Sequence, residues 1–85
     1  MAEYEIFFKE LVWKDFRELP KSNLKRIITR IEKLGDDPQL MSCEKITGEE
    51  LYRVRQGKYR IVYSIKLNEL TVWVIKVGHR KDEYR

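Results

Sequence analysis

The chain has 85 residues, of which 42% are hydrophobic and 38% are charged. We expect one domain over residues 1–85, because two halves would each bury too little apolar surface to offset the chain entropy lost on folding. No apolar stretch is long enough to span a membrane, and the acidic N-terminus differs from a secretion signal. The single cysteine, Cys43, excludes an internal disulfide, so we expect a cytoplasmic protein with no membrane association.

Positive charge is concentrated in the last third of the sequence. The formal net charge is +4 at pH 7. Residues 1–50 hold nine basic and eleven acidic side chains, whereas residues 51–85 hold nine basic and three acidic ones. This distribution favours a polyanionic partner such as nucleic acid, because neutralising phosphates releases their counterions. A solvated basic surface is the alternative interpretation.

The start of the chain predicts a strand and then a helix. Residues 4–8 are aromatic and β-branched, which is typical of a strand. Over residues 11–19 the apolar positions change to helical spacing, at Leu11, Val12, Phe16 and Leu19. Pro20 is expected to end this helix.

A second helix follows and has the strongest helical periodicity in the chain. It begins at Pro20 or Ser22 and carries an apolar stripe at Leu24, Ile27, Ile28, Ile31 and Leu34. We expect Gly35 to end it in a left-handed conformation, ahead of a turn at Asp37 and Pro38. The two helices therefore predict an amphipathic hairpin that covers one face of a sheet.

The second half of the chain predicts a loop followed by strands. Residues 39–50 have no clear period and are expected to form the loop. Three strands are expected, over residues 51–55, 58–67 and 70–77. Gln56 and Gly57 are expected to form the tight turn between the first two, and Asn68 and Glu69 the next turn. The order β-α-α-β-β-β predicts an α+β fold, with the helical hairpin on one face of a largely antiparallel sheet.

Simple counts exclude several kinds of site. A structural zinc needs about four Cys or His ligands, and the chain offers only Cys43 and His79. The same shortage argues against a nucleophilic triad. The sequence also has no glycine-rich phosphate-binding motif. We therefore expect neither a metal nor a cofactor.

Basic side chains gather around the predicted hairpin of residues 51–67. Side chains alternate across a strand, so Arg53 and Arg55 project from one face, and the tight turn returns Arg60 beside them. Guanidinium groups bind phosphate with two parallel hydrogen bonds. The segment that follows the last strand adds His79, Arg80, Lys81 and Tyr84. If it lies along the same sheet, its aromatic ring could stack on an unpaired base.

Each of these features also has a purely structural interpretation. Exposed arginines on strands often serve solubility and edge protection. The terminal segment could be a frayed polar tail. Four residues that share one face of the predicted second strand of the hairpin are expected to pack in the core: Tyr59, Ile61, Tyr63 and Ile65.

Two segments, LYRVRQGKYRIVYSI at 51–65 and VGHRKDEYR at 77–85, resemble the RelE/ParE superfamily of bacterial and archaeal toxins. The resemblance covers nearly the whole chain, because the bend at Leu19–Pro20 and the turn at Asp37–Pro38 also fit the family layout. It implies the same order of elements. RelE-type members are mRNA endonucleases that act in the ribosomal A site. They cleave by attack of the ribose 2′-hydroxyl on the neighbouring phosphate, which leaves a 2′,3′-cyclic phosphate and needs no metal.

The resemblance leaves functions of different classes open. ParE-type members share the fold but poison DNA gyrase without catalysis. A catalytically weakened RelE fold is a third possibility, because Arg53 and Arg55 stand where the best-known branch has lysines. The presence of Arg60, Arg80 and Tyr84 together favours the RelE-type endoribonuclease.

The resemblance also assigns roles residue by residue. It implies Arg60 and Arg80 at the scissile phosphate and Tyr84 stacked on the mRNA base. It places Arg53 and Arg55 on the backbone of mRNA and ribosomal RNA. Three further basic residues are RNA-binding candidates: Lys58, Lys81 and Arg85.

The general base is a separate question, because arginine does not lose its proton at working pH. His79 is the first candidate, since an imidazole ordinarily titrates near pH 6.5. Lys58, Lys81 and Tyr84 are weaker candidates. The partners implied by the resemblance are a RelB-like antitoxin, the ribosome and mRNA, and the free toxin is expected to be a monomer.

Overall fold

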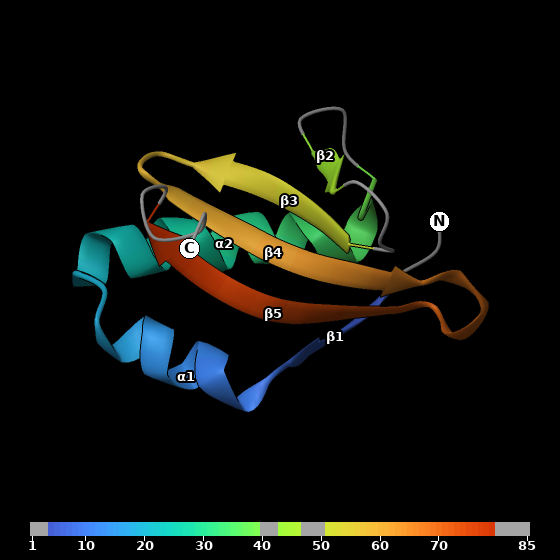
Figure 1. Cartoon of the computed structure of the whole chain (residues 1–85), viewed down its shortest axis with the longest axis horizontal. Coiled ribbons are helices and arrows are strands. Elements are labelled where there is room, and N and C mark those ends of the chain that lie inside the picture. The colour runs from blue at the N-terminus through green and yellow to red at the C-terminus, as the bar shows by residue number, and fades with distance from the viewer. Residues whose placement is uncertain (1–3, 40–42, 47–50, 80–85) are drawn as a thin grey trace.

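The computed structural model describes residues 4–39, 43–46 and 51–79. Within them the chain forms five strands and two α-helices (Figure 1). In chain order these are β1 (Glu5–Phe8), α1 (Glu10–Arg17), α2 (Lys21–Asp36), β2 (Glu44–Ile46), β3 (Leu51–Gln56), β4 (Tyr59–Lys66) and β5 (Thr71–His79). No helix within the described ranges is long and apolar enough to cross a membrane.

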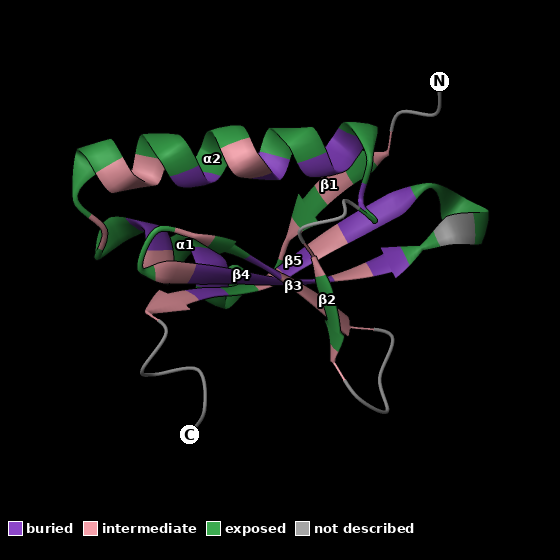
Figure 2. Ribbon diagram, turned by 90° about the horizontal axis from the view of Figure 1, so that it is seen from above, coloured by how far each residue is buried: buried purple, intermediate pink, exposed green. Residues whose placement is uncertain are grey.

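The five strands form one mixed sheet in the order β1-β5-β4-β3-β2. β1 runs parallel to β5, and every other neighbouring pair is antiparallel. α2 lies over one face of the sheet (Figure 2), and α1 lies beside β5 (Figure 1) and adds Val12 and Phe16 to the same core. The α+β class and the helical hairpin on a largely antiparallel sheet are therefore confirmed.

The core lies between the helices and the sheet, where buried residues from both layers meet (Figure 2). The fully buried side chains are Val12, Ile27, Ile31, Leu34, Val54, Ile61, Tyr63, Val72, Val74 and Val77. Tyr63 stacks on Tyr52 with ring centroids 5.8 Å apart, and its hydroxyl donates a 2.6 Å hydrogen bond to the carbonyl oxygen of Pro38. The expectation that Tyr59, Ile61, Tyr63 and Ile65 pack in the core is confirmed.

The first helix is shorter than predicted, and it buries only part of the predicted apolar stripe. It spans Glu10–Arg17, whereas the sequence predicts residues 11–19. Val12 and Phe16 are buried as expected, but the side chain of Leu11 is 71% exposed. An eight-residue helix is just over two turns long and presents only a narrow stripe to the sheet, so one of two consecutive apolar residues must face solvent.

Two glycines act differently from the prediction. Gly35 lies inside α2 and does not end it in a left-handed conformation; the helix continues to Asp36. A Cβ at Gly35 would lie 3.2 Å from Cδ1 of Ile6 and 3.3 Å from the carbonyl oxygen of Tyr4, so its missing side chain lets β1 approach the helix closely. Gly57 has φ +61°, and the turn of the hairpin is Gly57–Lys58, because Gln56 still pairs with Tyr59.

The prediction of a loop over residues 39–50 is wrong for residues 44–46, which form β2 at the edge of the sheet. Three residues are too few to show an alternating pattern, so β2 had no detectable signal. The turn expected at Asn68 and Glu69 is a short 3₁₀-helix, Leu67–Glu69, followed by Leu70 at φ +49°.

Candidate nucleic-acid interface

Arginine side chains converge on the face of the sheet that the helices leave open. In the β3–β4 pairing Arg55 is directly opposite Arg60, and on the other side of β4 Arg60 is opposite Gly78. Arg53 lies two residues before Arg55 and faces the same side, because Val54 between them is buried in the core. Arg60 is only 3% exposed, so its charge acts in surroundings less polar than water and is screened less by salt.

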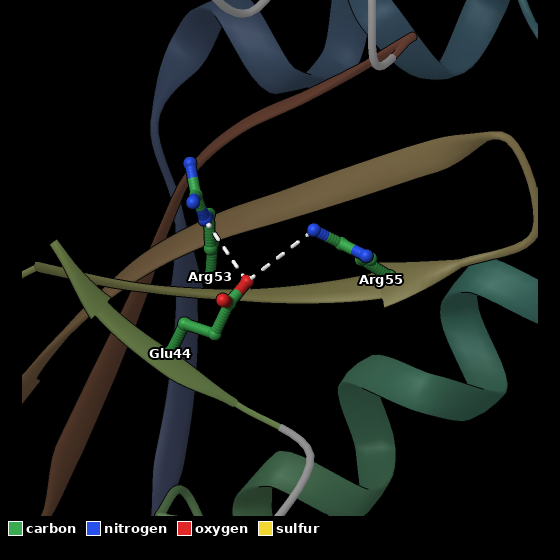
Figure 3. A network of polar contacts seen from close by, with 3 residues as sticks. All are labelled: Glu44, Arg53 and Arg55. Carbon is green, nitrogen blue, oxygen red and sulfur yellow. Dashed lines mark hydrogen bonds and ion pairs between the residues drawn. The ribbon is translucent and has the colours of Figure 1, made fainter.

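A carboxylate from the edge strand joins this arginine group (Figure 3). Oε1 of Glu44 lies 3.3 Å from Nε of Arg53 and 3.8 Å from a terminal nitrogen of Arg55. The sheet geometry explains both contacts, because Glu44 is the cross-strand partner of Arg53 and the diagonal neighbour of Arg55. Like charges on adjacent positions repel, so the shared carboxylate offsets part of the repulsion among the arginines.

Lys76 brings a further positive charge to this face. The β4–β5 register shifts between Val62 and Tyr63, which leaves Ile75 as an extra residue on β5 and aligns Lys76 with Val62. The side chain of Lys76 passes over Gly78, where an added Cβ would lie 3.4 Å from Cε of the lysine. Its Nζ lies 3.9 Å from Oδ1 of Asp15.

Asp15 attaches α1 to the end of β5. Its Oδ2 accepts a 3.1 Å hydrogen bond from the backbone N–H of Val77, two residues before His79. No pattern in the sequence marks Asp15 or Lys76 as a site residue. Neither lies in a motif, and their contact joins residues 61 positions apart, so only the fold reveals it.

His79 lies with Tyr59 on the helix side of the sheet. The two residues are cross-strand partners, and their rings meet edge to face with centroids 5.8 Å apart. The hydroxyl of Tyr59 accepts a 3.3 Å hydrogen bond from the side-chain amide of Asn23 on α2. A cleft of about 250 Å³ opens beside this pair, and its lining includes Asp15, Glu18, Tyr59 and His79.

The structure therefore brings together some of the predicted site residues and separates others. Arg53, Arg55 and Arg60 share the open face, whereas His79 lies at the same end of the sheet but on the opposite face. Lys58 sits in the hairpin turn, where it lines a second cleft with Asn23, Arg26 and Tyr59. Four candidates lie outside the described residues: Arg80, Lys81, Tyr84 and Arg85.

Among residues 4–39, 43–46 and 51–79, no group of three or more His, Cys, Asp or Glu side chains is placed to hold a metal ion. The positive charge on the open face comes from arginine and lysine. Such a surface suits an anionic ligand whose phosphates bind planar guanidinium groups.

Comparison with known proteins decides the family. A family model described as the ParE toxin of type II toxin–antitoxin systems matches residues 6–84 of this chain. The chain belongs to the RelE/ParE superfamily of toxins. The match covers both helices, β5 and the two strands that carry the arginines, β3 and β4, in agreement with a resemblance over nearly the whole chain.

Individual relatives of the toxin are of RelE type. A protein of Methanocaldococcus jannaschii that carries the name toxin RelE1 is 30% identical over an alignment of 87 residues. The alignment covers 98% of this chain and 97% of the relative. The RelBE2 toxin–antitoxin complex of Mycobacterium tuberculosis contains a chain of similar structure, with a TM-score of 0.81 and 26% identity over 92% of the toxin and 99% of that chain. A RelE–RelB complex of Pyrococcus horikoshii gives a TM-score of 0.80 and 27% identity over 94% and 97%.

Proposed function

We propose that this toxin is a metal-independent endoribonuclease that cleaves mRNA in the ribosomal A site. The observation that carries the proposal is the convergence of Arg53, Arg55 and Arg60 on the open face of the sheet. A buried guanidinium at Arg60, flanked by a more exposed one at Arg55, provides a fixed site for a crowded phosphate and a flexible one for the neighbouring backbone.

In this mechanism the substrate supplies its own nucleophile. The ribose 2′-oxygen bonds to the adjacent phosphorus, the bond from phosphorus to the 5′-oxygen of the next nucleotide breaks, and a 2′,3′-cyclic phosphate remains. Negative charge builds up on the phosphoryl oxygens in the transition state. Arg60 is proposed to stabilise that charge. Its side chain is only 3% exposed, so the groups that cover it have to move aside when the phosphate binds.

Two protons must move in the reaction, one from the 2′-hydroxyl and one to the departing 5′-oxygen. We assign the base to His79, which lies on the helix side at the end of the sheet where Arg60 pairs with Gly78. In this assignment the RNA passes around that end of the sheet, so that the 2′-hydroxyl reaches the imidazole while the phosphate lies on the arginine face. The edge contact with Tyr59 fixes the position of the imidazole ring. Arg80 is proposed to share the scissile phosphate with Arg60.

The remaining site residues are proposed to hold the RNA. Tyr84 stacks on a base of the mRNA. Arg53 and Arg55 bind the backbone of mRNA and ribosomal RNA. Three further basic residues add to the contact with the RNA backbone: Lys58, Lys81 and Arg85.

A RelB-like antitoxin is the proposed protein partner, and the free toxin is proposed to be a monomer. The similar chains from Mycobacterium tuberculosis and Pyrococcus horikoshii were solved in complexes with their antitoxins. An acidic segment of the partner would match the basic last third of this chain, since opposite charges steer association.

A second candidate function is noncatalytic inhibition of DNA gyrase. The observation that favours it is the description of the matching family model, which names the ParE toxin. Under this alternative the arginine face would bind a protein or DNA. The toxin would then not cleave mRNA, and substituting the arginines would not change that.

The proposal is tested by adding the purified toxin to programmed ribosomes with a defined mRNA and mapping the 3′ ends. We expect cleavage in the A-site codon, and a loss of rate of about 100-fold or more for Arg60→Ala, as for removal of one preorganised charge-stabilising group. Lys66→Ala is the matched control, because Lys66 is an exposed cation at the far end of the same strand.

Arg60 is buried, so its variants are also checked for folding by circular dichroism. Arg60→Lys keeps the charge without the two-pronged guanidinium, and we expect it to fold and to recover only part of the rate. Intact mRNA together with inhibited gyrase supercoiling would replace the proposal with the gyrase function. Intact mRNA without gyrase inhibition would indicate a catalytically weakened toxin.

A further inference from the structure

The shared contact of Glu44 with two arginines has the geometry of a bound anion. One carboxylate oxygen lies between Nε of Arg53, at 3.3 Å, and a terminal nitrogen of Arg55, at 3.8 Å (Figure 3). An oxygen of an RNA phosphate would use the same two donors. Glu44 thus occupies a position that the RNA backbone needs under the function proposed above, on which this inference rests.

The contact is built so that it can be exchanged. The side chains of Glu44 and Arg55 are each 51% exposed, and ion pairs of this exposure contribute little net free energy because water and salt screen them. β2 is only three residues long and lies at the edge of the sheet, where it pairs with β3 and with no other described strand. A phosphate can therefore displace the carboxylate without opening the core.

We propose that Glu44 is a competing anion built into the chain, which occupies the phosphate position between Arg53 and Arg55 until RNA replaces it. Its consequence is selectivity. The binding free energy of a short or isolated phosphate at the two arginines is too small to displace a tethered carboxylate. An RNA strand that also binds Arg60 has enough binding free energy to displace it. Glu44 lowers the affinity of the free toxin for polyanions in general and is a specificity-determining residue.

The proposal is tested by equilibrium binding of the full chain to a 2′-O-methyl RNA oligonucleotide, which cannot be cleaved by 2′-hydroxyl attack. Fluorescence anisotropy is measured over a range of salt concentrations. For Glu44→Gln we expect affinity to rise by about threefold to tenfold at low salt. The plot of log K against log salt should steepen by about 0.7 for each phosphate that gains an arginine contact.

Glu5→Gln is the matched control, because Glu5 is also an exposed glutamate on an edge strand of the same sheet and lies on the same face of β1 as Phe7, away from the core. It removes the same charge and should leave both affinity and salt slope within about twofold of wild type. A rise in affinity shared by both variants would mean that net charge alone is responsible, and would overturn the proposal.

Other outcomes separate this inference from the proposed function. If Glu44→Gln binds no tighter than wild type while Arg53→Ala and Arg55→Ala bind less tightly, Glu44 only orients the arginines and the inference fails, but the RNA interface stands. If the arginine variants bind as well as wild type, the interface is elsewhere and both proposals fail. A role of Glu44 in folding alone would lower thermal stability without changing the salt slope.

Discussion

The two faces of β4 are made from alternate residues of one eight-residue strand, and they differ in polarity and charge. Ile61, Tyr63 and Ile65 face the helices and are buried in apolar surroundings. Arg60, Ser64 and Lys66 face the other way, together with Val62, the apolar member of that face. The comparison shows how a small domain separates stability from function: one face holds the core, and the other is available for charge that a core could not accommodate.

The largest expected effect comes from breaking the core face. Ile61→Ala removes a fully buried side chain next to Val54 and Val77, its partners across the sheet, and should lower the free energy of unfolding by about 2–5 kcal/mol. Urea unfolding measures this change. Ile28→Ala on α2 is the control, because this isoleucine is partly exposed and should cost less than about 1 kcal/mol. Equal losses for the two variants would contradict the assigned core.

A smaller loss of stability is expected from removing the hydroxyl of Tyr63, which is buried on the core face of β4. Tyr63→Phe removes the hydrogen bond to Pro38 and leaves a buried carbonyl without its donor, which should cost about 1–2 kcal/mol. Tyr59→Phe, whose hydroxyl lies nearer the surface and accepts a longer bond, should cost less. Chemical unfolding of both variants at pH 7 measures the difference.

Tyr63 also predicts a dependence of stability on alkaline pH. Burial raises the pKa of its hydroxyl, with a further contribution from Cys43. A folded-state pKa above the unfolded value of about 10 means that the stability is fully present below pH 10 and is lost as pH rises above it. Relative to Tyr63→Phe, the wild-type free energy of unfolding should fall by up to about 1.4 kcal/mol per pH unit above 10. Parallel pH profiles for the two proteins would contradict this prediction.

The smallest effect on stability is expected on the open face. Arg55→Ala removes an exposed side chain that faces another arginine across the strands, so the free energy of unfolding should change by no more than about 0.5 kcal/mol. Affinity for single-stranded RNA should nevertheless fall, with a salt slope shallower by about 0.7. Thermal unfolding and anisotropy measure the two effects, and Lys66→Ala serves as the control. A large loss of stability would show that the open face also supports the fold.

The parts of the fold that follow from local pattern were predictable from the sequence. The apolar stripe of α2, the break at Pro20 and the alternation that buries Tyr63 are all properties of neighbouring residues. The arginines of β3 and β4 were predictable for the same reason. The register of the turn was not, because Gln56 and Lys58 are both compatible with a tight turn around Gly57.

The arrangement at the end of β5 could not be predicted, because it depends on one extra residue. Val74 is buried in the core, so strict alternation would place Lys76 toward the helices as well. The bulge at Ile75 reverses this, so Lys76 faces the arginines while Val77 enters the core. The same shift aligns His79 with Tyr59 on the helix side. A bulge has no clear signature in a strand as uniformly apolar as residues 70–77.

The hydrogen bond from Val77 to Asp15 has a consequence for how the toxin behaves in a crowded solution. β1 pairs with β5 only as far as Val74, so the later part of β5 borders no strand on that side among the described residues. An open strand edge is a template on which a second chain can pair and begin to aggregate. Asp15 occupies the backbone donor that an incoming strand would use, and its negative charge repels the carbonyl oxygens of that strand. The first helix therefore protects the sheet from self-association as well as covering the core.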